Sequence, residues 1–251
     1  MLPIDAETLN GLTREQLIAA LEVHEEEQRR RRQRQFFELF PDDGPNARHL
    51  YPKHLEFFEY GATMRERCFM AANRVGKTVG GGYELACHLT GLYPDWWPGS
   101  RFPHPIRAWA AGKTNETTRD IVQAKTLGPI AYTKTGRKTV SGEGIIPGEH
   151  LAQPSWKQGV PDLVDTIKVK HKSGGWSVLG LKSYQQGRGS FEGTEQDVIW
   201  LDEEPPLEIY GECLIRTATT KGLILLTFTP LEGMSEVVMQ FLPRSMRPEG
   251  V

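Results

Sequence analysis

After residue 46, short apolar runs alternate with polar or glycine-containing segments. The runs at 68–71, 106–110, 166–171, 176–182, 198–201 and 223–228 have the length and composition of strands. Two of them, VIWL and LILL, are apolar at every position, which is typical of strands buried on both faces of a parallel sheet. The pattern therefore predicts an α/β fold with a mainly parallel central sheet flanked by helices.

Residues 13–40 instead follow a helical pattern. Thr13 and Gln16 form a capping-box pattern, and the apolar residues after them share one face, so we expect a helix over 13–40. In the run 25–34, each of three Glu residues has an Arg four positions further along the chain, an order that stabilises a helix through ion pairs. We interpret the run as a solvated helix, and the alternative is a docking arm for DNA or a partner subunit. Turn-forming residues at 41–46 predict a linker.

Composition and charge narrow the class of protein. The 251 residues are enough for a self-sufficient core, and a formal charge of −2 means that any nucleic-acid surface must be local. The three cysteines form no Cys-x-x-Cys pair and the histidines show no ligand spacing, which argues against a disulfide framework and a zinc site. The apolar runs are too short to cross a bilayer and the N-terminus lacks a signal-peptide pattern, so we expect a protein that is neither membrane-bound nor secreted.

The strongest chemical motif is AANRVGKT, which follows an apolar run and precedes a helix-compatible stretch. This order is that of a phosphate-binding loop, although Ala71 stands where the motif usually begins with Gly. Lys77 would reach the β- and γ-phosphates of a nucleotide, and Thr78 would offer its hydroxyl to Mg²⁺. The loop residues expected to cradle the phosphates are Ala72, Asn73, Arg74, Val75 and Gly76.

A second Gly-Lys-Thr occurs at 112–114. Only Ala111 separates it from the preceding predicted strand, which is too little chain to wrap a phosphate. We therefore interpret it as a chance match.

Two further predicted strands end in polar residues. Asp202 and Glu203 directly follow the VIWL run. Asp202 would hold Mg²⁺, and Glu203 would polarise the attacking water. The alternative is that these carboxylates form an acidic cap on the next helix. Thr227 and Thr229 end the LILL run, where a hydroxyl can sense the γ-phosphate and report hydrolysis.

Together these segments resemble the ATPase domain of the large terminase subunit of tailed double-stranded-DNA bacteriophages, a P-loop NTPase of the ASCE, RecA-like type. The resemblance begins near residue 50 and is carried by ERCFMAANRVGKT, CHLTGLYP, SYQQGRGSFEG, VIWLDEEPPLEIYGECLIRT and LLTFTPLEGMSEVV. It implies a Walker A loop at Lys77 and Thr78, a Walker B aspartate and catalytic glutamate at Asp202 and Glu203, and a coupling motif at 227–229.

The resemblance also implies contacts to the base and to the γ-phosphate. An adenine-contacting segment is expected at 51–58, with His54 where the family carries glutamine. Arg74 would touch the γ-phosphate within the same subunit. Arg188 and Arg216 are candidates for an arginine finger that reaches a neighbour's site; alternatively they contact DNA phosphates or form surface ion pairs.

We therefore expect a helical N-terminal segment at 1–45 and, at 46–251, an ATPase domain that uses ATP and Mg²⁺ to drive double-stranded DNA into the prohead. The resemblance implies the portal protein, the small terminase subunit and further copies in a ring as partners, in the host cytoplasm. Six basic residues of this domain are candidates for contact with DNA, and the alternative is that they are scattered, solvated residues. They are Lys113, Arg119, Lys125, Lys134, Arg137 and Lys138. The family's nuclease domain has no counterpart before Val251, so no DNA cutting is expected.

Three other functions would share part of this pattern. A helicase-like nucleic-acid ATPase would need a second motor-like domain, for which the length leaves no room. A nucleotide-dependent assembly module would not need a water-activating carboxylate such as Glu203. A GTPase would carry an Asn-Lys-x-Asp motif, which the sequence lacks.

Overall fold

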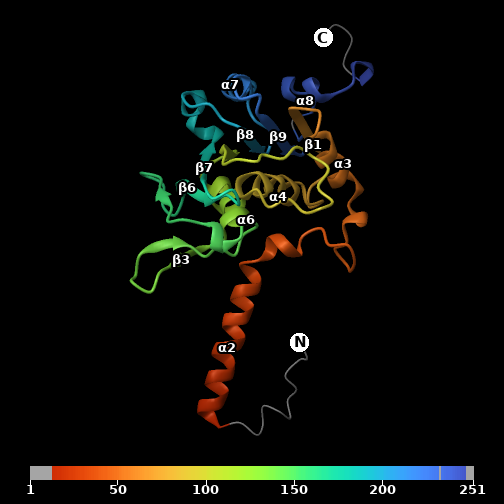
Figure 1. Cartoon of the computed structure of the whole chain (residues 1–251). Helices are drawn as coiled ribbons and strands as arrows, with labels where there is room; N and C mark the ends of the chain where they lie inside the picture. The colour runs from red at the N-terminus through yellow and green to blue at the C-terminus, as the bar shows by residue number, and fades with distance from the viewer. Residues whose placement is uncertain (1–12, 232, 247–251) are drawn as a thin grey trace.

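The computed structural model describes residues 13–231 and 233–246, and within them a seven-stranded sheet forms the centre of the molecule (Figure 1). From edge to edge its strands are β1 (Glu66–Met70), β9 (Leu223–Phe228), β8 (Val198–Asp202), β2 (Arg107–Gly112), β7 (Trp176–Ser183), β6 (Val164–Lys170) and β5 (Ser155–Trp156). The strands from β1 to β7 in this order are parallel, whereas β6 and β5 pair antiparallel with their neighbours. The predicted α/β fold with a mainly parallel sheet is confirmed.

Every predicted apolar run is a strand of this sheet, with ends that differ by at most two residues. Strand β9 lies between β1, which leads into the phosphate-binding loop, and β8, which carries the acidic residues; this order agrees with the expected P-loop class. The sequence pattern did not predict β5, nor the separate antiparallel pair β3 (Ile130–Tyr132) and β4 (Lys138–Val140). Strands of two or three residues are too short to show a period.

Helices cover both faces of this sheet, and one more, α2 (Arg14–Arg32), extends away from it (Figure 1). The others are α3 (Pro52–Tyr60), α4 (Lys77–Thr90), α5 (Asn115–Thr117), α6 (Ala124–Leu127), α7 (Leu207–Ala218) and α8 (Glu236–Phe241). Short 3₁₀ turns lie at Gln35–Glu38, Arg48–Leu50, Gly148–His150, Tyr184–Gln186, Arg188–Phe191 and Arg244–Met246, and a π-helical turn lies at Thr118–Gln123. In the described part of the chain, no helix is both long and apolar enough to cross a membrane.

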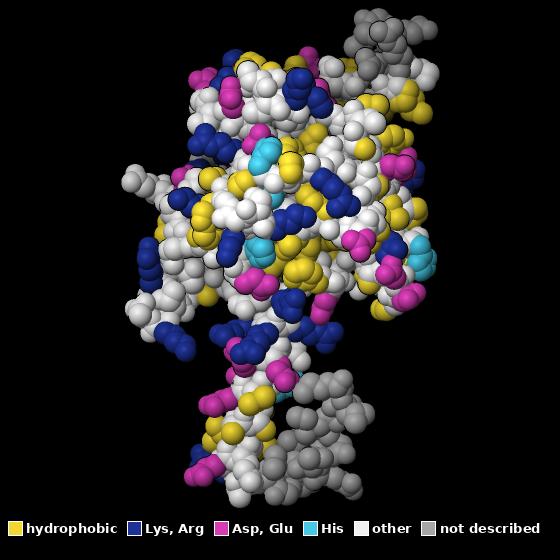
Figure 2. All heavy atoms as spheres, viewed as in Figure 1, with side chains coloured by type: hydrophobic (Ala, Val, Ile, Leu, Met, Phe, Trp, Pro, Cys, Tyr) yellow, Lys and Arg dark blue, Asp and Glu magenta, His cyan; other side chains and the backbone are white. Residues whose placement is uncertain are grey.

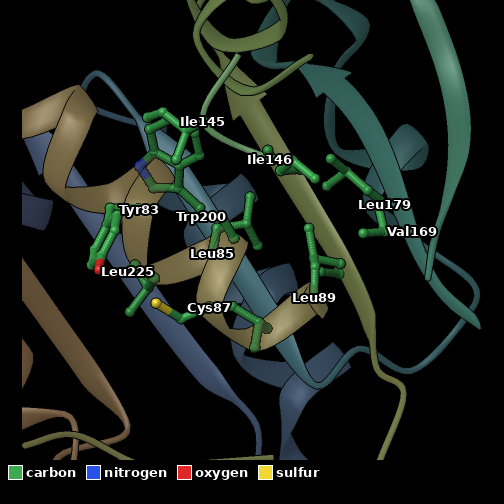
Figure 3. Packing of buried hydrophobic residues seen from close by; sticks show 14 of the residues in the cluster. Tyr83, Leu85, Cys87, Leu89, Ile145, Ile146, Val169, Leu179, Trp200 and Leu225 are labelled. Carbon is green, nitrogen blue, oxygen red and sulfur yellow. The ribbon is translucent and has the colours of Figure 1, made fainter. Parts of the chain in front are cut away.

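Hydrophobic cores lie on both faces of the sheet. On one face α4 packs on β8 and β9, and Leu85 and Leu89 of the helix belong to the same buried cluster as Trp200 and Leu225 of the strands (Figure 3). On the other face α7 and α8 pack against the alternate residues of the same strands, such as Ile199. The all-apolar runs are therefore buried on both sides, as their pattern predicts.

A glycine brings α4 close to the acidic strand. A Cβ atom at Gly81 would lie 2.5 Å from Nε1 of the fully buried Trp200 on β8, so a larger residue would push the helix away. Trp200 Nε1 also donates a hydrogen bond of 2.8 Å to Thr227 Oγ1 on β9. This packing places the start of α4, with Lys77 and Thr78, beside the carboxyl ends of both strands.

Helix α2 extends away from the body and has no buried residue (Figure 1). Its start is as predicted, because Thr13 caps it and forms the capping box with Gln16. The predicted continuation past Arg32 is wrong: the chain turns there, and a short 3₁₀ turn carries Phe36 into the core, which Phe40 also joins. Burial of these two aromatic rings favours the turn over a longer exposed helix.

Charges of both signs line α2 (Figure 2). Of the three predicted i, i+4 pairs, the structure shows that of Glu26 with Arg30, at 2.9 Å. The arginines of the other two predicted pairs bond to different residues, Arg29 to Glu26 and Arg31 to Glu38 beyond the helix. Both the solvated helix and the docking arm fit these contacts. The division into a segment 1–45 and a domain 46–251 stays a prediction.

Candidate nucleotide-binding and hydrolysis site

The loop between β1 and α4 has the strand, loop and helix order that its sequence predicts. Gly76 and Arg74 have left-handed backbones, with φ of 86° and 65°, so the loop turns sharply before the helix begins. It folds around Lys77, whose Nζ donates to the carbonyl oxygens of Ala71 at 2.8 Å and Ala72 at 2.6 Å. Burial lowers the pKa of Lys77 although Asp202 opposes this shift. A buried ammonium group enclosed by carbonyl oxygens is suited to an anionic ligand.

Asp202 lies at the carboxyl end of β8, directly beside the start of α4. Thr78 Oγ1 lies 3.1 Å from Asp202 Oδ1 and 3.3 Å from Oδ2, and Thr227 Oγ1 donates to Oδ1 at 2.7 Å. Burial raises the pKa of Asp202 to about 6, although both hydroxyl groups lower it. Hydroxyl and carboxylate oxygens are ligands that Mg²⁺ prefers, so Thr78 and Asp202 fit this ion.

Glu203 follows Asp202 in a strained turn and belongs to the same cleft. Its backbone is left-handed, with φ of 67°, which is uncommon for a residue with a side chain. The cleft has a volume of about 650 Å³. Its lining includes Asn73, Arg74, Gly76, Lys77, Thr78, Lys113, Lys125, Asp202, Glu203, Glu204, Thr227 and Thr229. The structure thus brings the two predicted motifs together in one cavity.

The two threonines after the LILL run connect the motifs. Thr227 is buried and accepts from Trp200 while it donates to Asp202. Thr229 Oγ1 accepts from Lys77 Nζ at 2.9 Å and lies 2.8 Å from Asn73 Oδ1. One threonine therefore contacts the acidic strand and the other contacts the phosphate-binding loop.

The comparisons with known proteins agree with this geometry. Residues 68–251 match the family model described as "Terminase large subunit, T4likevirus-type, N-terminal". The chain belongs to the terminase large-subunit family. Over 262 aligned residues it is 38% identical to the large terminase subunit of Salmonella phage P22, and the match covers 97% of this chain and 49% of that protein. The chain therefore spans about half the length of this relative.

A solved structure of the large terminase from a thermophilic bacteriophage, in complex with ADP, is also similar to the terminase chain. The match covers 70% of this chain and 37% of that one, with 13% identity and a TM-score of 0.44. A likeness this weak carries nothing about the site, which depends on the contacts described above.

His54 lies behind the phosphate-binding loop of the terminase chain. It is buried on α3, and its Nε2 lies 3.2 Å from the carbonyl oxygen of Gly76. Burial lowers the pKa of His54, so the neutral ring donates this hydrogen bond. A Cβ atom at Gly80 would lie 2.9 Å from the ring. The observed contact is with the loop backbone, and the predicted contact with the adenine base stays a prediction.

The three candidate arginines lie in two places. Arg74 belongs to the lining of the cleft. Arg188 and Arg216 instead both form ion pairs with the buried carboxylate of Glu212, each with an N–O distance of 3.0 Å. The predicted ion-pair alternative for these two residues is therefore observed within the chain, and their action on a neighbouring subunit stays a prediction.

The structure places two of the basic residues in an unexpected position. Lys113 follows β2, Lys125 lies on α6, and both belong to the lining of the same cleft as Lys77 and Asp202. The Gly-Lys-Thr that contains Lys113 is not a phosphate-binding loop, because Gly112 still belongs to β2 and Thr114 caps α5. The position of Lys113 could have been predicted from the sequence. It directly follows the predicted strand at 106–110, and in a parallel sheet the carboxyl end of that strand lies at the same edge as the carboxyl end of β8.

No group of three or more His, Cys, Asp or Glu side chains that could hold a metal is found in the described residues. The fit to Mg²⁺ consequently depends on Thr78 and Asp202, with water completing the coordination.

The replacement Asp202→Asn is expected to stabilise the protein without magnesium at pH 8. Burial raises the pKa of Asp202 to about 6, so the folded state disfavours the charged carboxylate at every pH above this value. The free energy of unfolding should rise by on the order of 3 kcal/mol in the variant at pH 8. As the pH falls through 6 toward 4, Asp202 takes up a proton and the difference should disappear. Urea unfolding at both pH values measures this, and an equal effect at pH 8 and pH 4 would contradict it.

Proposed function

We propose that the chain is the ATPase motor part of a phage large terminase, which hydrolyses ATP and couples hydrolysis to the movement of double-stranded DNA into the prohead. The observation that supports this best is the meeting of Lys77, Thr78, Asp202, Glu203 and Thr229 in one cleft. Membership of the terminase family supports the DNA substrate.

Each residue of the cleft has a separate role in the proposed hydrolysis. The ammonium group of Lys77 neutralises phosphate charge, and Arg74 adds a second cation from the same loop. Glu203 orients the attacking water and accepts its proton. A magnesium ion held by Thr78 and Asp202 would neutralise charge on the phosphate oxygens.

Thr229 is positioned to link nucleotide occupancy to movement. Its hydroxyl accepts from Lys77 Nζ in this structure, and a phosphate group would compete for that ammonium group. Thr229 follows β9, which pairs with both β1 and β8, so a change in its partner acts on the centre of the sheet. In this proposal Thr227 and Thr229 together transmit hydrolysis to the DNA-gripping surface.

The hairpin formed by β3 and β4 is the basic surface best suited to grip DNA. It projects from the body of the molecule (Figure 1), and Tyr132 on it is 69% exposed. Lys134 and Arg137 are both exposed at its tip, where Gly136 closes the turn with φ of 76°. Within the described residues, neither basic side chain has an ion-pair partner. Lys138 differs, because it pairs with Asp162 at 2.5 Å.

Removal of the two basic groups at this tip tests the proposed function. The double variant Lys134→Ala/Arg137→Ala is expected to bind duplex DNA more weakly and to reduce the slope of log affinity against log salt by about 2. DNA-stimulated ATP hydrolysis should fall with it, while hydrolysis without DNA stays unchanged, since the tip is not in the cleft lining.

The matched control is the double variant Arg29→Ala/Arg30→Ala on α2, which removes the same charge from the other basic segment. Loss of DNA stimulation in this control alone would overturn the hairpin assignment and favour α2 as the DNA-docking arm. A wild-type chain that binds ATP and magnesium but never turns ATP over would favour the nucleotide-dependent assembly module.

The partners and location follow from the family and are part of the proposal. The large terminase would work as a ring of identical subunits in the host cytoplasm, together with the portal protein and the small terminase subunit. In such a ring the exposed Arg188 would face a neighbouring subunit. The charged helix α2, which contacts little of its own body, is available to a partner.

A further inference from the structure

The 3₁₀ turn that follows β7 reaches the turn that carries Glu203. Tyr184, its first residue, is only 6% exposed. Its hydroxyl group hydrogen-bonds to the carbonyl oxygen of Asp202 at 2.9 Å and to that of Glu203 at 3.0 Å. One phenol therefore contacts the peptide groups on both sides of the Glu203 Cα atom.

The backbone at Glu203 needs such support. A residue with a side chain at φ of 67° is strained and keeps this conformation only when its surroundings fix it. From β9, the carbonyl oxygen of Thr227 accepts the Glu203 N–H at 3.0 Å. From the turn after β7, the hydroxyl of Tyr184 binds the carbonyl oxygens. The strained turn is thus held from two neighbouring elements.

We infer that Tyr184 is a positioning residue, which fixes the turn of Glu203 so that its carboxylate faces the water that attacks the γ-phosphate. The expected effect of Tyr184 on turnover rests on the proposed function, ATP hydrolysis. Burial raises the pKa of Tyr184 well above its usual range, so the phenol keeps its proton and remains a donor throughout the physiological range.

The same turn is also attached to the other wall of the cleft. Gln185 N–H donates to the carbonyl oxygen of Lys113 at 3.1 Å, and Ser183 Oγ donates to Asn115 Oδ1 at 2.8 Å. The residues 183–185 therefore join the corner after β2, which carries Lys113, to the corner after β8, which carries Glu203. A displacement of either corner is transmitted to the other through Tyr184.

The replacement Tyr184→Phe tests the inference, because it removes the hydroxyl and keeps the buried ring. The turnover number for ATP is expected to fall about 10-fold or more, while KM stays within about twofold, since the loop that binds the phosphates is not touched. The hydrogen-exchange protection of the Glu203 amide should fall by a similar factor, because the turn is then held from β9 alone.

The matched control is Tyr210→Phe. Tyr210 is also buried, and its hydroxyl also hydrogen-bonds within the chain, but the partner is Glu66 at the amino end of β1, away from the cleft. Turnover and Glu203 exchange should both stay at the wild-type value in this variant. Equal losses in the two variants would mean that any buried hydroxyl matters, which would overturn the inference.

The outcomes separate this inference from the proposed function. Wild-type turnover in Tyr184→Phe would overturn the positioning role while ATP hydrolysis stands. Absence of hydrolysis in every variant, the wild type included, would overturn the proposed function instead. In that case the exchange rate decides alone: an unchanged Glu203 amide would show that Tyr184 does not hold the turn.

Discussion

The replacement Glu203→Gln is expected to lower ATP turnover by about 10³-fold and to leave ATP affinity nearly unchanged. Glutamine keeps the size of the side chain and the left-handed backbone of the turn, but its amide cannot accept a proton from water. The groups expected to hold the phosphates and the metal, Lys77, Thr78 and Asp202, are all retained. Phosphate release at saturating ATP measures turnover, and titration with a fluorescent nucleotide measures affinity.

The matched control is Glu204→Gln, one position along the chain. Glu204 belongs to the same cleft lining, but its carboxylate accepts the hydroxyl of Ser235, the N-cap of α8, so its contact is structural. Turnover in this variant should stay within a few-fold of the wild type. If Glu204→Gln proved as inactive as Glu203→Gln, or if Glu203→Gln retained its activity, the assignment of the water-activating group would be wrong.

The sequence predicted the strands and the motifs of the cleft because both are local patterns. A run such as VIWL is apolar at every position only when both faces of its strand are covered, and β8 is covered by α4 on one side and α7 on the other. Parallel strands place their carboxyl ends at one edge, so the meeting of Asp202 with the loop at Lys77 follows from the fold class.

The remaining contacts depend on packing, which no local pattern encodes. His54 contacts the backbone of the loop because α3 lies behind it, and the sequence spacing alone could not distinguish this from a contact with the base. Arg216 and Glu212 are four positions apart on α7, but Arg188 reaches the same carboxylate only because the turn after β7 lies against that helix. For Tyr184, the capping box between Ser183 and Gln186 marks the turn in the sequence, but not its partner.

The largest expected effect on stability lies outside the cleft, in the ion pair between Arg67 and Glu84. Both side chains are buried, at 4% and 0% exposed, and two hydrogen bonds of 2.5 and 3.1 Å join them. Arg67 also donates to the carbonyl oxygen of Phe57 at 2.6 Å, and Glu84 accepts from His88 at 3.2 Å. Arg67 belongs to β1 and Glu84 to α4, and the phosphate-binding loop connects these two elements. The ion pair therefore holds together the strand before the loop and the helix after it.

The replacement Arg67→Met should lower the free energy of unfolding by about 3 to 5 kcal/mol, because it leaves the carboxylate of Glu84 buried without its cation. Urea unfolding at pH 7.5 measures the loss. The ATP affinity of the folded variant should also fall, since β1 and α4 are then free to separate at the loop.

The double replacement Arg67→Met/Glu84→Leu is the informative control. It removes both charges from a site where Arg67 Nε already lacks a partner among the described residues, so it should be less destabilising than Arg67→Met alone. A double variant as unstable as the single one would show that packing, not the unpaired charge, causes the loss.

The pH dependence gives the charge argument a second test. Burial alone would raise the pKa of Glu84, but Arg67 and His88 outweigh it and hold the pKa below its usual range. A carboxylate with a lowered pKa contributes stability above its unfolded pKa of about 4.3, and this contribution is lost as the pH falls through the folded value. The wild type should therefore lose stability below pH 4 relative to the double variant, which has no carboxylate there to protonate. A constant difference between pH 7.5 and pH 3.5 would mean that Glu84 does not depend on Arg67 for its charge.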